Sequence, residues 1–562
     1  MRSDTSNQSE GRKNSVAETC FEHFLAVWQD SKVQSSSRIW MVFFAGLVLI
    51  CGATWLIGAV PTKIYGHDVF MWLAGGWRAL NGQRAHVDFT SPFGPLMFMI
   101  TGLGLEISHH SVDGVGYGSA IVALIVGTWS FFLAKNRLAS SPRLILSLFL
   151  AALAAAPYPL GLSPFMSSHA MLYNRYAYAL LGLILLECFK AARSPKSSPA
   201  YEWIGGTSTG AALSLALFLK VTYFLVALVL IGGISLLLWR FSRQRILGIF
   251  LGVSLVSTCM LAYLRFDVAA MIGDLRMAAA PRAGALRSPV GIVLNHASVL
   301  LGVALFCFAA ALLFGNRVPQ WRGLKLLLLG AFIFVVDVAL LLSNAQLGDF
   351  PVCAIFAILL VNEVTEDQQS LPAPQAHSYR PSYAAVLCLG ALLFLPQFTS
   401  DLAGLAYGVR EKERPSNPQA LLRFTSPNLR PLLLYDAPGN PPAEGRLFTA
   451  YVNDGVALLE RETAPNETIL TIDASNPFPY AMERRPPRGG HPAPMYHFNM
   501  DDQHRPSDDW YFGDADIVMV PKRASQGDQY YIDFYKAYEP GLKQRYALAA
   551  ESDRWWMYRR KR

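Results

Sequence analysis

The first 400 residues alternate between long apolar runs and short polar loops. A run of about 20 apolar residues can cross about 30 Å of hydrocarbon as an α-helix. Two shorter runs, 92–107 and 350–361, leave it open whether each one crosses. The full-length predicted crossings lie at 39–60, 115–134, 144–162, 171–189, 203–219, 221–239, 246–264, 290–314, 330–342 (with its flanks) and 384–398.

Basic residues in the short loops predict the orientation of these helices. Lysines and arginines gather at 135–143, 190–196, 240–245 and 317–325, and such loops tend to face the cytoplasm. Two apolar runs separate each consecutive pair of basic loops, so the assignment is self-consistent. It places residues 1–38 in the cytoplasm and the chain after residue 400 outside, with about eleven crossings between them. Residues 92–107 then form a re-entrant or interfacial helix on the outer side.

The composition indicates a polytopic α-helical membrane protein. Hydrophobic residues make up 52% of the 562 residues and charged residues only 16%, which is too apolar for a soluble protein of this length. The first 30 residues lack the apolar core of a cleavable signal peptide, so the first crossing is expected to anchor the chain. The seven cysteines all precede residue 389 and imply no disulfide framework. The formal charge of +8, spread over loops and tail, favours anionic lipids over nucleic acid as partners.

The composition becomes that of a soluble protein after residue 400. Residues 401–445 are rich in Pro and Asn and predict an irregular linker, and 446–562 predict a small extracytoplasmic α/β domain. The predicted organisation is therefore a cytoplasmic tail at 1–38, a transmembrane domain at 39–400, this linker and this domain. Within the last domain, helices are expected at 448–461 and 530–538, and strands at 468–472, 517–520, 546–549 and 555–558.

The first outer loop, 61–91, holds the residues best suited to chemistry. Asp68 stands at the start of an amphipathic run, 69–80, which predicts a helix lying on the membrane surface and ending at Asn81-Gly82. The chain then returns to Asp88 and to a break rich in Pro and Gly before the next helix. Both carboxylates are therefore expected beside the outer face of the bilayer.

Several features of this loop form one pattern: an acidic residue soon after the first crossing, a surface helix ending near Asn-Gly, an aromatic-acidic pair, and Gly94-Pro95-Leu96 opening the next helix. The pattern resembles the integral-membrane glycosyltransferases of the GT-C superfamily, which includes protein O-mannosyltransferases and aminoarabinose transferases. The resemblance covers residues 39–350 and is strongest over 65–96. It implies that Asp68 holds the catalytic acidic position and that the donor is a sugar on a polyprenyl phosphate. The Asp-Glu pair common in that class is absent, because Val69 follows Asp68.

Glycosyl transfer is chemistry that a single carboxylate can support. Transfer to a hydroxyl or amine needs a base that removes the acceptor proton while the phosphate departs from an oxocarbenium-like centre. Asp68 is the candidate general base, and Asp88 is the candidate second carboxylate. The alternative is that Asp68 only caps the surface helix. His67 and His86 flank these residues as candidate hydrogen-bond partners or metal ligands, or as packing residues.

Basic residues predicted on the outer side are candidates for binding the donor phosphate. Guanidinium groups bind phosphate oxygens bidentately, and arginines outside run against the usual charge bias of membrane loops. Contact with anionic lipid headgroups, or a different topology, would account for them equally well. Lys220 interrupts an apolar run, where it would neutralise the phosphate or mark a turn. The phosphate-binding candidates are Lys220, Arg175, Arg265, Arg276, Arg282 and Arg287, and the candidate site-shaping residues beside them are His169 and Tyr173.

No motif assigns a metal or another cofactor. The sequence has no zinc-ligand spacing, Walker sequence or His-Glu-x-x-His. Asp514-Ala515-Asp516 matches the Asp-x-Asp of nucleotide-sugar enzymes, but it precedes an apolar strand and lacks a phosphate-cradling glycine loop. No metal ligand is therefore named, and a requirement for a divalent metal is left open.

These features together predict a membrane glycosyltransferase of the cell's inner or plasma membrane. It would transfer a hexose or pentose from a polyprenyl-phosphate donor to a lipid, glycan or protein acceptor on the outer face. A non-catalytic transporter or flippase of lipid-linked glycans is one alternative, but it should show an internal repeat, which is not seen. A GT-C scaffold without catalysis is another, because of Val69. The sequence leaves sugar, acceptor, stereochemistry and oligomeric state open.

Overall fold

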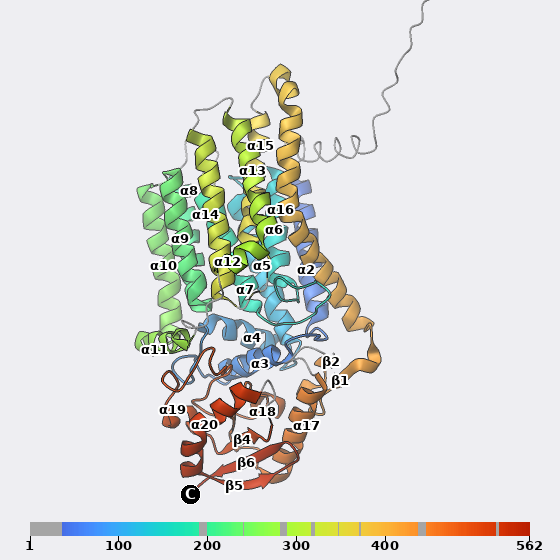
Figure 1. Cartoon of the computed structure of the whole chain (residues 1–562), viewed down its shortest axis with the longest axis vertical. Helices are drawn as coiled ribbons and strands as arrows, with labels where there is room; N and C mark the ends of the chain where they lie inside the picture. Colours follow the sequence, from blue (N-terminus) through green and yellow to red (C-terminus); the bar gives the residue numbers. More distant parts are fainter. Residues whose placement is uncertain are drawn as a thin grey trace, which may run out of the picture.

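A computed structural model shows a long helical bundle followed by a smaller unit built on a sheet (Figure 1). The structure describes residues 36–189, 199–239, 241–281, 289–315, 321–344, 346, 348–369, 373–436, 445–523 and 528–562. Two short helices, α3 (Gly66–Leu80) and α4 (Pro95–Ile107), lie between the bundle and the sheet. The predicted outer loop therefore sits at the junction of the two parts of the molecule.

The bundle confirms the prediction of a mostly helical membrane protein. Six helices of the described ranges are each long and apolar enough to cross a membrane, so the chain is an integral membrane protein. The count of eleven crossings and the direction of the termini stay predictions. The bundle helices are α2 (Ser36–Ile57), α5 (Gly114–Ala134), α6 (Ser140–Ala155), α7 (Leu172–Phe189), α8 (Pro199–Leu219), α9 (Val221–Leu238), α10 (Arg243–Tyr263), α12 (Pro289–Asn295), α13 (Ala297–Gly315), α14 (Trp321–Ser343), α15 (Pro351–Gln369) and α16 (Ala373–Glu413).

Two bundle segments differ from their predicted form. The apolar run 290–314 is divided at His296 into α12 and α13. The helix α16 runs on to Glu413, so the irregular linker predicted from residue 401 is wrong over 401–413. The reason is local composition, because the prolines of this region begin only at Pro415 and the residues before it are good helix formers.

The C-terminal part contains the small α/β layer that the sequence predicts. Its sheet has the order β3-β4-β6-β5, in which β3 and β4 are parallel and the other neighbours antiparallel. A separate antiparallel pair, β1 (Leu421–Arg423) and β2 (Leu433–Tyr435), falls inside the predicted linker. The remaining elements are α17 (Gly445–Glu462), β3 (Ile469–Thr471), α18 (Phe478–Ala481), α19 (Asp508–Phe512), β4 (Ile517–Pro521), α20 (Asp528–Arg545), β5 (Tyr546–Glu551) and β6 (Trp555–Arg560), with 3₁₀ turns at Pro418–Ala420 and Pro427–Leu429.

The helix α3 is present as predicted, but it does not present one side to water. Every residue from Val69 to Arg78 is buried. On one side α3 packs on α4 so closely that a Cβ at Gly75 would lie 2.1 Å from the Phe98 ring, so only glycine fits there. On the other side Phe70 packs against aromatic rings from the C-terminal part of the chain. The predicted surface helix is therefore an internal layer of the protein.

Candidate functional site

The carboxylate of Asp68 does not cap its helix. The N-cap residue of α3 is Tyr65, which has a left-handed backbone (φ 54°), and no side chain makes a capping hydrogen bond there. Asp68 Oδ1 instead lies 3.1 Å from His67 Nε2, and the side chain is 14% exposed. The carboxylate is thus close to water, with a histidine as its polar neighbour. A free carboxylate beside solvent suits a proton acceptor better than a cap does.

His67 lines a narrow recess between the first outer loop and the C-terminal part. The recess has room for about one water molecule, and Thr62, Lys63, Tyr435 and Phe448 also line it. The ammonium group of Lys63 donates to the Tyr407 hydroxyl and lies 5.1 Å from the centre of the Tyr435 ring. Sequence reasoning missed Lys63, although it stands five residues before Asp68 in the same loop. Lys63 and His67, the neighbour of the candidate base, therefore line the same recess.

Lys220 lies in an aromatic cluster that reaches back to α3. The residue is buried at the N-cap of α9, and its ammonium group lies 4.2 Å from the centre of the Tyr173 ring. It also donates to Asn344 Oδ1. Tyr173 contacts Trp72, which follows Asp68 by about one helical turn, with 5.7 Å between ring centroids. The structure therefore joins two of the predicted site residues, Lys220 and Tyr173, to the helix that carries Asp68.

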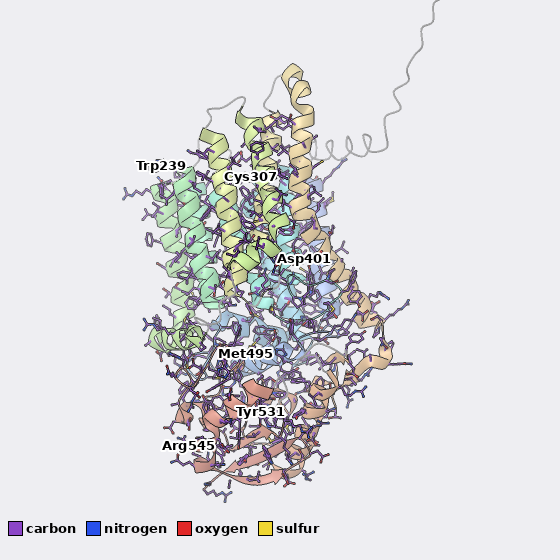
Figure 2. The ribbon with its side chains drawn as sticks, in the orientation of Figure 1. Trp239, Cys307, Asp401, Met495, Tyr531 and Arg545 are labelled. Atoms are coloured by element: carbon purple, nitrogen blue, oxygen red, sulfur yellow. The ribbon has the colours of Figure 1, made fainter. Side chains whose placement is uncertain are left out.

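Arg175 is committed to an internal ion pair. Its guanidinium group donates to Asp401 Oδ1 at 2.9 Å and to the carbonyl oxygens of Leu153 and Tyr158. Both charged side chains are at most 1% exposed, and Asp401 lies within the helical part of the molecule (Figure 2). The prediction that Arg175 binds a donor phosphate is therefore corrected. A buried arginine in an apolar helix needs a carboxylate, and α16 supplies it.

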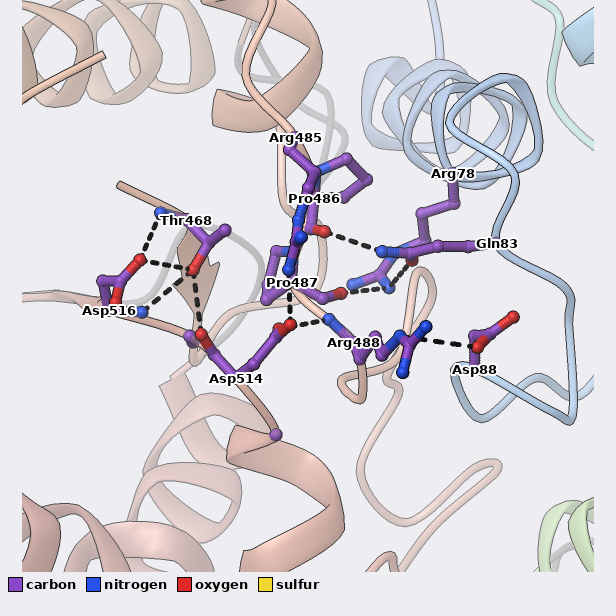
Figure 3. A network of polar contacts seen from close by, with 12 residues as sticks. Arg78, Gln83, Asp88, Thr468, Arg485, Pro486, Pro487, Arg488, Asp514 and Asp516 are labelled. Carbon is purple, nitrogen blue, oxygen red and sulfur yellow. Dashed lines mark hydrogen bonds and ion pairs between the residues drawn. The ribbon is translucent and has the colours of Figure 1, made fainter. Parts of the chain in front are cut away.

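Asp88 lies at the opposite end of α3 from Asp68. The Gln83 amide donates to the carbonyl oxygen of Arg78, and the Arg84 amide donates to Asp88 Oδ2, so this turn stays beside the end of the helix. Ten residues of helix separate Asp68 from Arg78, a rise of about 15 Å. Asp88 therefore does not supply a second carboxylate beside Asp68. Its own neighbour is Arg488, with 3.7 Å between Nε and Oδ1 (Figure 3).

His86 holds the end of the outer loop against the loop after α10. That loop, predicted as an arginine-rich stretch, contains the helix α11 (Val268–Ala279). Asp274 of α11 accepts hydrogen bonds from His86 Nδ1 at 2.9 Å and from the Ser91 amide at 3.0 Å. Burial raises the pKa of the Asp274 carboxyl. Nothing in the sequence pattern pairs these residues, which are 188 positions apart.

Two of the four arginines predicted to bind phosphate in this loop, Arg265 and Arg276, belong to the described residues. Arg265 and Arg276 are exposed, and no ion pair or hydrogen bond of their side chains is found within the described ranges. Arg282 and Arg287 lie outside the described residues. Arg265 precedes α11 and Arg276 lies in its last turn, and α11 follows the lower end of α10 (Figure 1). Both guanidinium groups are therefore available to an anionic group at this level of the bundle.

His169 positions backbone and is not aimed at a site. Its Nε2 accepts from the Val60 amide at 3.0 Å, and its carbonyl oxygen accepts from Trp72 Nε1 at 2.9 Å. Burial lowers the pKa of the imidazole to about 4, so the ring is neutral at pH 7. His169 thus ties α3 to the chain that follows α2.

Side chains at the end of α3 donate hydrogen bonds to backbone carbonyls of the C-terminal part and so attach the two parts to each other. Arg78 Nη1 donates to Gln83 Oε1 and to Pro487 O, both at 2.8 Å, and Gln83 Nε2 donates to Pro486 O at 2.7 Å (Figure 3). Trp77 Nε1 donates to another carbonyl of the same loop, that of Arg484, at 2.8 Å. Burial lowers the pKa of the Arg78 guanidinium to about 10, which leaves it charged at pH 7.

The carboxylates of the Asp-x-Asp sequence accept hydrogen bonds within the C-terminal part. Asp514 accepts from the Arg485 side chain and the Arg488 amide, and Asp516 accepts from the Thr468 amide and hydroxyl (Figure 3). Both carboxylates thus have structural partners. Among the residues that the structure describes, no group of three or more His, Cys, Asp or Glu side chains could hold a metal ion.

Arg78→Met is expected to loosen the C-terminal part from α3. The variant leaves the Pro487 carbonyl and the Gln83 amide oxygen without their buried donor, which costs roughly 2 kcal/mol of unfolding free energy. Thermal unfolding and limited proteolysis of the purified protein in detergent measure the effect. Arg446→Met, at a side chain 77% exposed, is the matched control and should change neither. Equal behaviour of the two variants would contradict the role given to Arg78.

Comparison with known proteins finds likeness only among solved structures. No family model matches the sequence, and no curated protein matches it. ArnT from Cupriavidus metallidurans bound to undecaprenyl phosphate aligns over 93% of this chain and 98% of its own, with 13% identity and a TM-score of 0.48. Its apo state aligns over the same shares with 13% identity and a TM-score of 0.43. The archaeal oligosaccharyltransferase AglB from Archaeoglobus fulgidus, in complex with an inhibitory peptide and a dolichol-phosphate, aligns over 85% of this chain and 69% of its own, with 11% identity and a TM-score of 0.34.

The chain is thus similar, at low identity, to solved structures of ArnT and AglB. TM-scores below 0.5 decide nothing about the activity of this protein.

Proposed function

We propose that this chain is a GT-C-type membrane glycosyltransferase that moves a sugar from a polyprenyl-phosphate carrier to an acceptor at the junction between the bundle and the sheet. The observation that carries the proposal is the state of Asp68. Its carboxylate is free of capping duty, remains 14% exposed, and has His67 at 3.1 Å. A carboxylate held in this way, in a loop beside membrane helices, is placed to take a proton from an acceptor that meets a lipid-borne donor.

In the proposed reaction the acceptor oxygen or nitrogen attacks the anomeric carbon of the donor sugar. The bond from that carbon to the phosphate oxygen breaks, and the polyprenyl phosphate leaves with the bonding electron pair. Asp68 takes the proton of the acceptor, and His67 orients the carboxylate. Because the phosphate is a good leaving group, one base is enough, and the distance of Asp88 from Asp68 is compatible with this reaction.

The cations around α3 are proposed to serve the leaving phosphate. Lys63 stands in the recess beside His67, and Lys220 reaches the same helix through Tyr173 and Trp72. Arg265 and Arg276 would hold the phosphate or an anionic lipid headgroup near α11. We further propose that the N-terminus faces the cytoplasm and that the sheet lies outside the membrane, because α10 begins, with Arg243 and Arg245, at the end of the bundle away from the sheet (Figure 1).

Proteoliposomes of the full chain supplied with radiolabelled polyprenyl-phosphate sugars test the proposal directly. Transfer of label into water-soluble, lipid or protein acceptors from a membrane extract is the expected result. Failure of every donor, with protein shown to be folded by its thermal transition, would favour the transporter or the inactive scaffold.

Lys220→Met is expected to raise the KM for the lipid donor by about tenfold, because a charge-assisted hydrogen bond to phosphate is worth roughly 1.5–3 kcal/mol. The rate at saturating donor should change less. Lys135→Met, at an exposed lysine of a predicted cytoplasmic loop, is the control and should leave KM unchanged. An unchanged KM in the folded Lys220 variant would remove Lys220 from the donor site.

A further inference from the structure

A second cavity in the described part of the chain is separate from the candidate site. It is a groove of about 590 Å³ between α13, α16 and the start of α15. This volume is in the range of sites that bind small molecules, about 300–1,000 Å³. Leu392, one of its lining residues, is 69% exposed. The groove therefore opens sideways, toward the hydrocarbon of a membrane around the bundle.

Polarity changes along the groove in the direction of the bundle axis. The lining residues nearer the sheet include His296, Asp349 and Gln397, at the break before α13, in the loop before α15 and in the later part of α16. Farther from the sheet the lining is apolar, with Gly302 of α13 facing Leu393 of α16. This is the profile of an outer-leaflet lipid, with its head at the membrane surface and its tail in the hydrocarbon.

Charge indicates which kind of headgroup fits. Asp349 is the charged residue among the described lining residues, and neither lysine nor arginine is among them. Its Oδ2 accepts from the Gly161 amide at 2.7 Å, and its backbone is left-handed, with φ 63°. Because the described lining carries a carboxylate and neither lysine nor arginine, a lipid headgroup with only negative charge would be repelled. A positively charged headgroup with N–H donors would be attracted to Asp349.

We propose that this groove binds a membrane lipid with two properties: a hydrocarbon tail that lies along α13 and α16, and an ammonium-bearing headgroup that pairs with Asp349. The site is distinct from the site around Asp68 and Lys220, because neither of these residues lines the groove. Asn344, which bonds Lys220, does not line it either, whereas Asp349 does. The proposal does not depend on glycosyl transfer.

Photolabelling of the full chain in phosphatidylcholine vesicles tests this site. The probes are traces of diazirine-tailed lipids with the same chains and an ethanolamine, choline or glycerol head. Labelled peptides should fall at residues 299–302 and 389–397, with about threefold more label from the ethanolamine probe than from the choline probe, as for a partly exposed ion pair. Equal labelling by all three probes would overturn the headgroup assignment and indicate a non-selective lipid surface.

Two variants test separately the binding of the lipid tail and the binding of the lipid headgroup. Gly302→Leu would place a side chain toward Leu393, because even a Cβ there lies 3.2 Å from Leu393 Cδ2, and it should reduce all labelling of the groove. Gly232→Leu, where nothing lies within 4 Å of the added Cβ, is the matched control. Asp349→Asn keeps an acceptor for the Gly161 amide and tolerates the left-handed backbone, so it should fold and lose only the ethanolamine preference. Full labelling of Gly302→Leu, or an undiminished preference in Asp349→Asn, would refute the site.

Discussion

Asp68→Asn is expected to lower the rate of sugar transfer by a factor of about 100 to 10,000, the usual contribution of a general base. The substitution is nearly isosteric and removes only the ability to accept a proton. It also distinguishes the two roles considered for this residue, since asparagine caps a helix about as well as aspartate does. The measurement is the rate at saturating donor in proteoliposomes, together with the thermal transition of the purified variant.

Two further variants serve as controls for Asp68→Asn. Asp68→Glu retains a carboxylate and should recover part of the rate. Asp267→Asn alters a carboxylate that does cap a helix, accepting from the Ala270 amide, and should leave the rate unchanged. An Asp68→Asn protein that folds normally and transfers sugar at the parent rate would exclude Asp68 as the base.

Asp401→Leu is expected to destabilise the bundle by roughly 3–5 kcal/mol, because it strands the buried guanidinium of Arg175. The Tyr158 hydroxyl loses its acceptor in the same variant. The double variant Arg175→Met/Asp401→Leu removes both charges and should recover a large part of that loss. Unfolding in detergent with increasing denaturant, compared across the two single variants and the double variant, gives the coupling free energy.

Two results would contradict the role given to the ion pair of Arg175 and Asp401. If the double variant is no more stable than Asp401→Leu, the loss comes from packing and hydrogen bonds of the tyrosine and not from a stranded charge. If Asp401→Leu costs less than about 1 kcal/mol, the ion pair carries none of the weight assigned to it.

The sequence predicts those parts of the fold that depend on local pattern. Apolar runs of membrane-spanning length locate α2, α5, α9 and α10 within a few residues, because each helix satisfies its own backbone inside hydrocarbon. The helix α3 and its position before the turn at Asn81 are predicted from its amphipathic pattern and from the Asn-Gly stop. The burial of α3 could not be predicted, because the rings that cover Phe70 come from Phe424 and Phe448, more than 350 residues away along the chain.

The candidate site was predictable only as a set of residue types. The sequence predicts Asp68, Lys220 and Tyr173 as site residues, and in the structure Lys220 and Tyr173 lie in one aromatic cluster with Trp72, on the helix that carries Asp68. Arg175 was placed in the same set because a sequence cannot show that Asp401, 226 positions later, neutralises it. Ion pairs between residues so far apart in the chain depend on how the helices pack. The hydrophobic pattern of the sequence does not indicate that packing.

The hydrogen bonds between α3 and the C-terminal part can form only late in synthesis. Trp77 donates to the carbonyl of Arg484, which is 407 residues further along the chain. At about 5–20 residues per second, ribosomes need roughly 20–80 s to make that length. Until Phe424 and Phe448 are made, late in this interval, Phe70 of α3 has no cover from the C-terminal part. A nascent chain that stalls before residue 484 therefore exposes this helix to chaperones and proteases, and quality control can distinguish it from the finished protein.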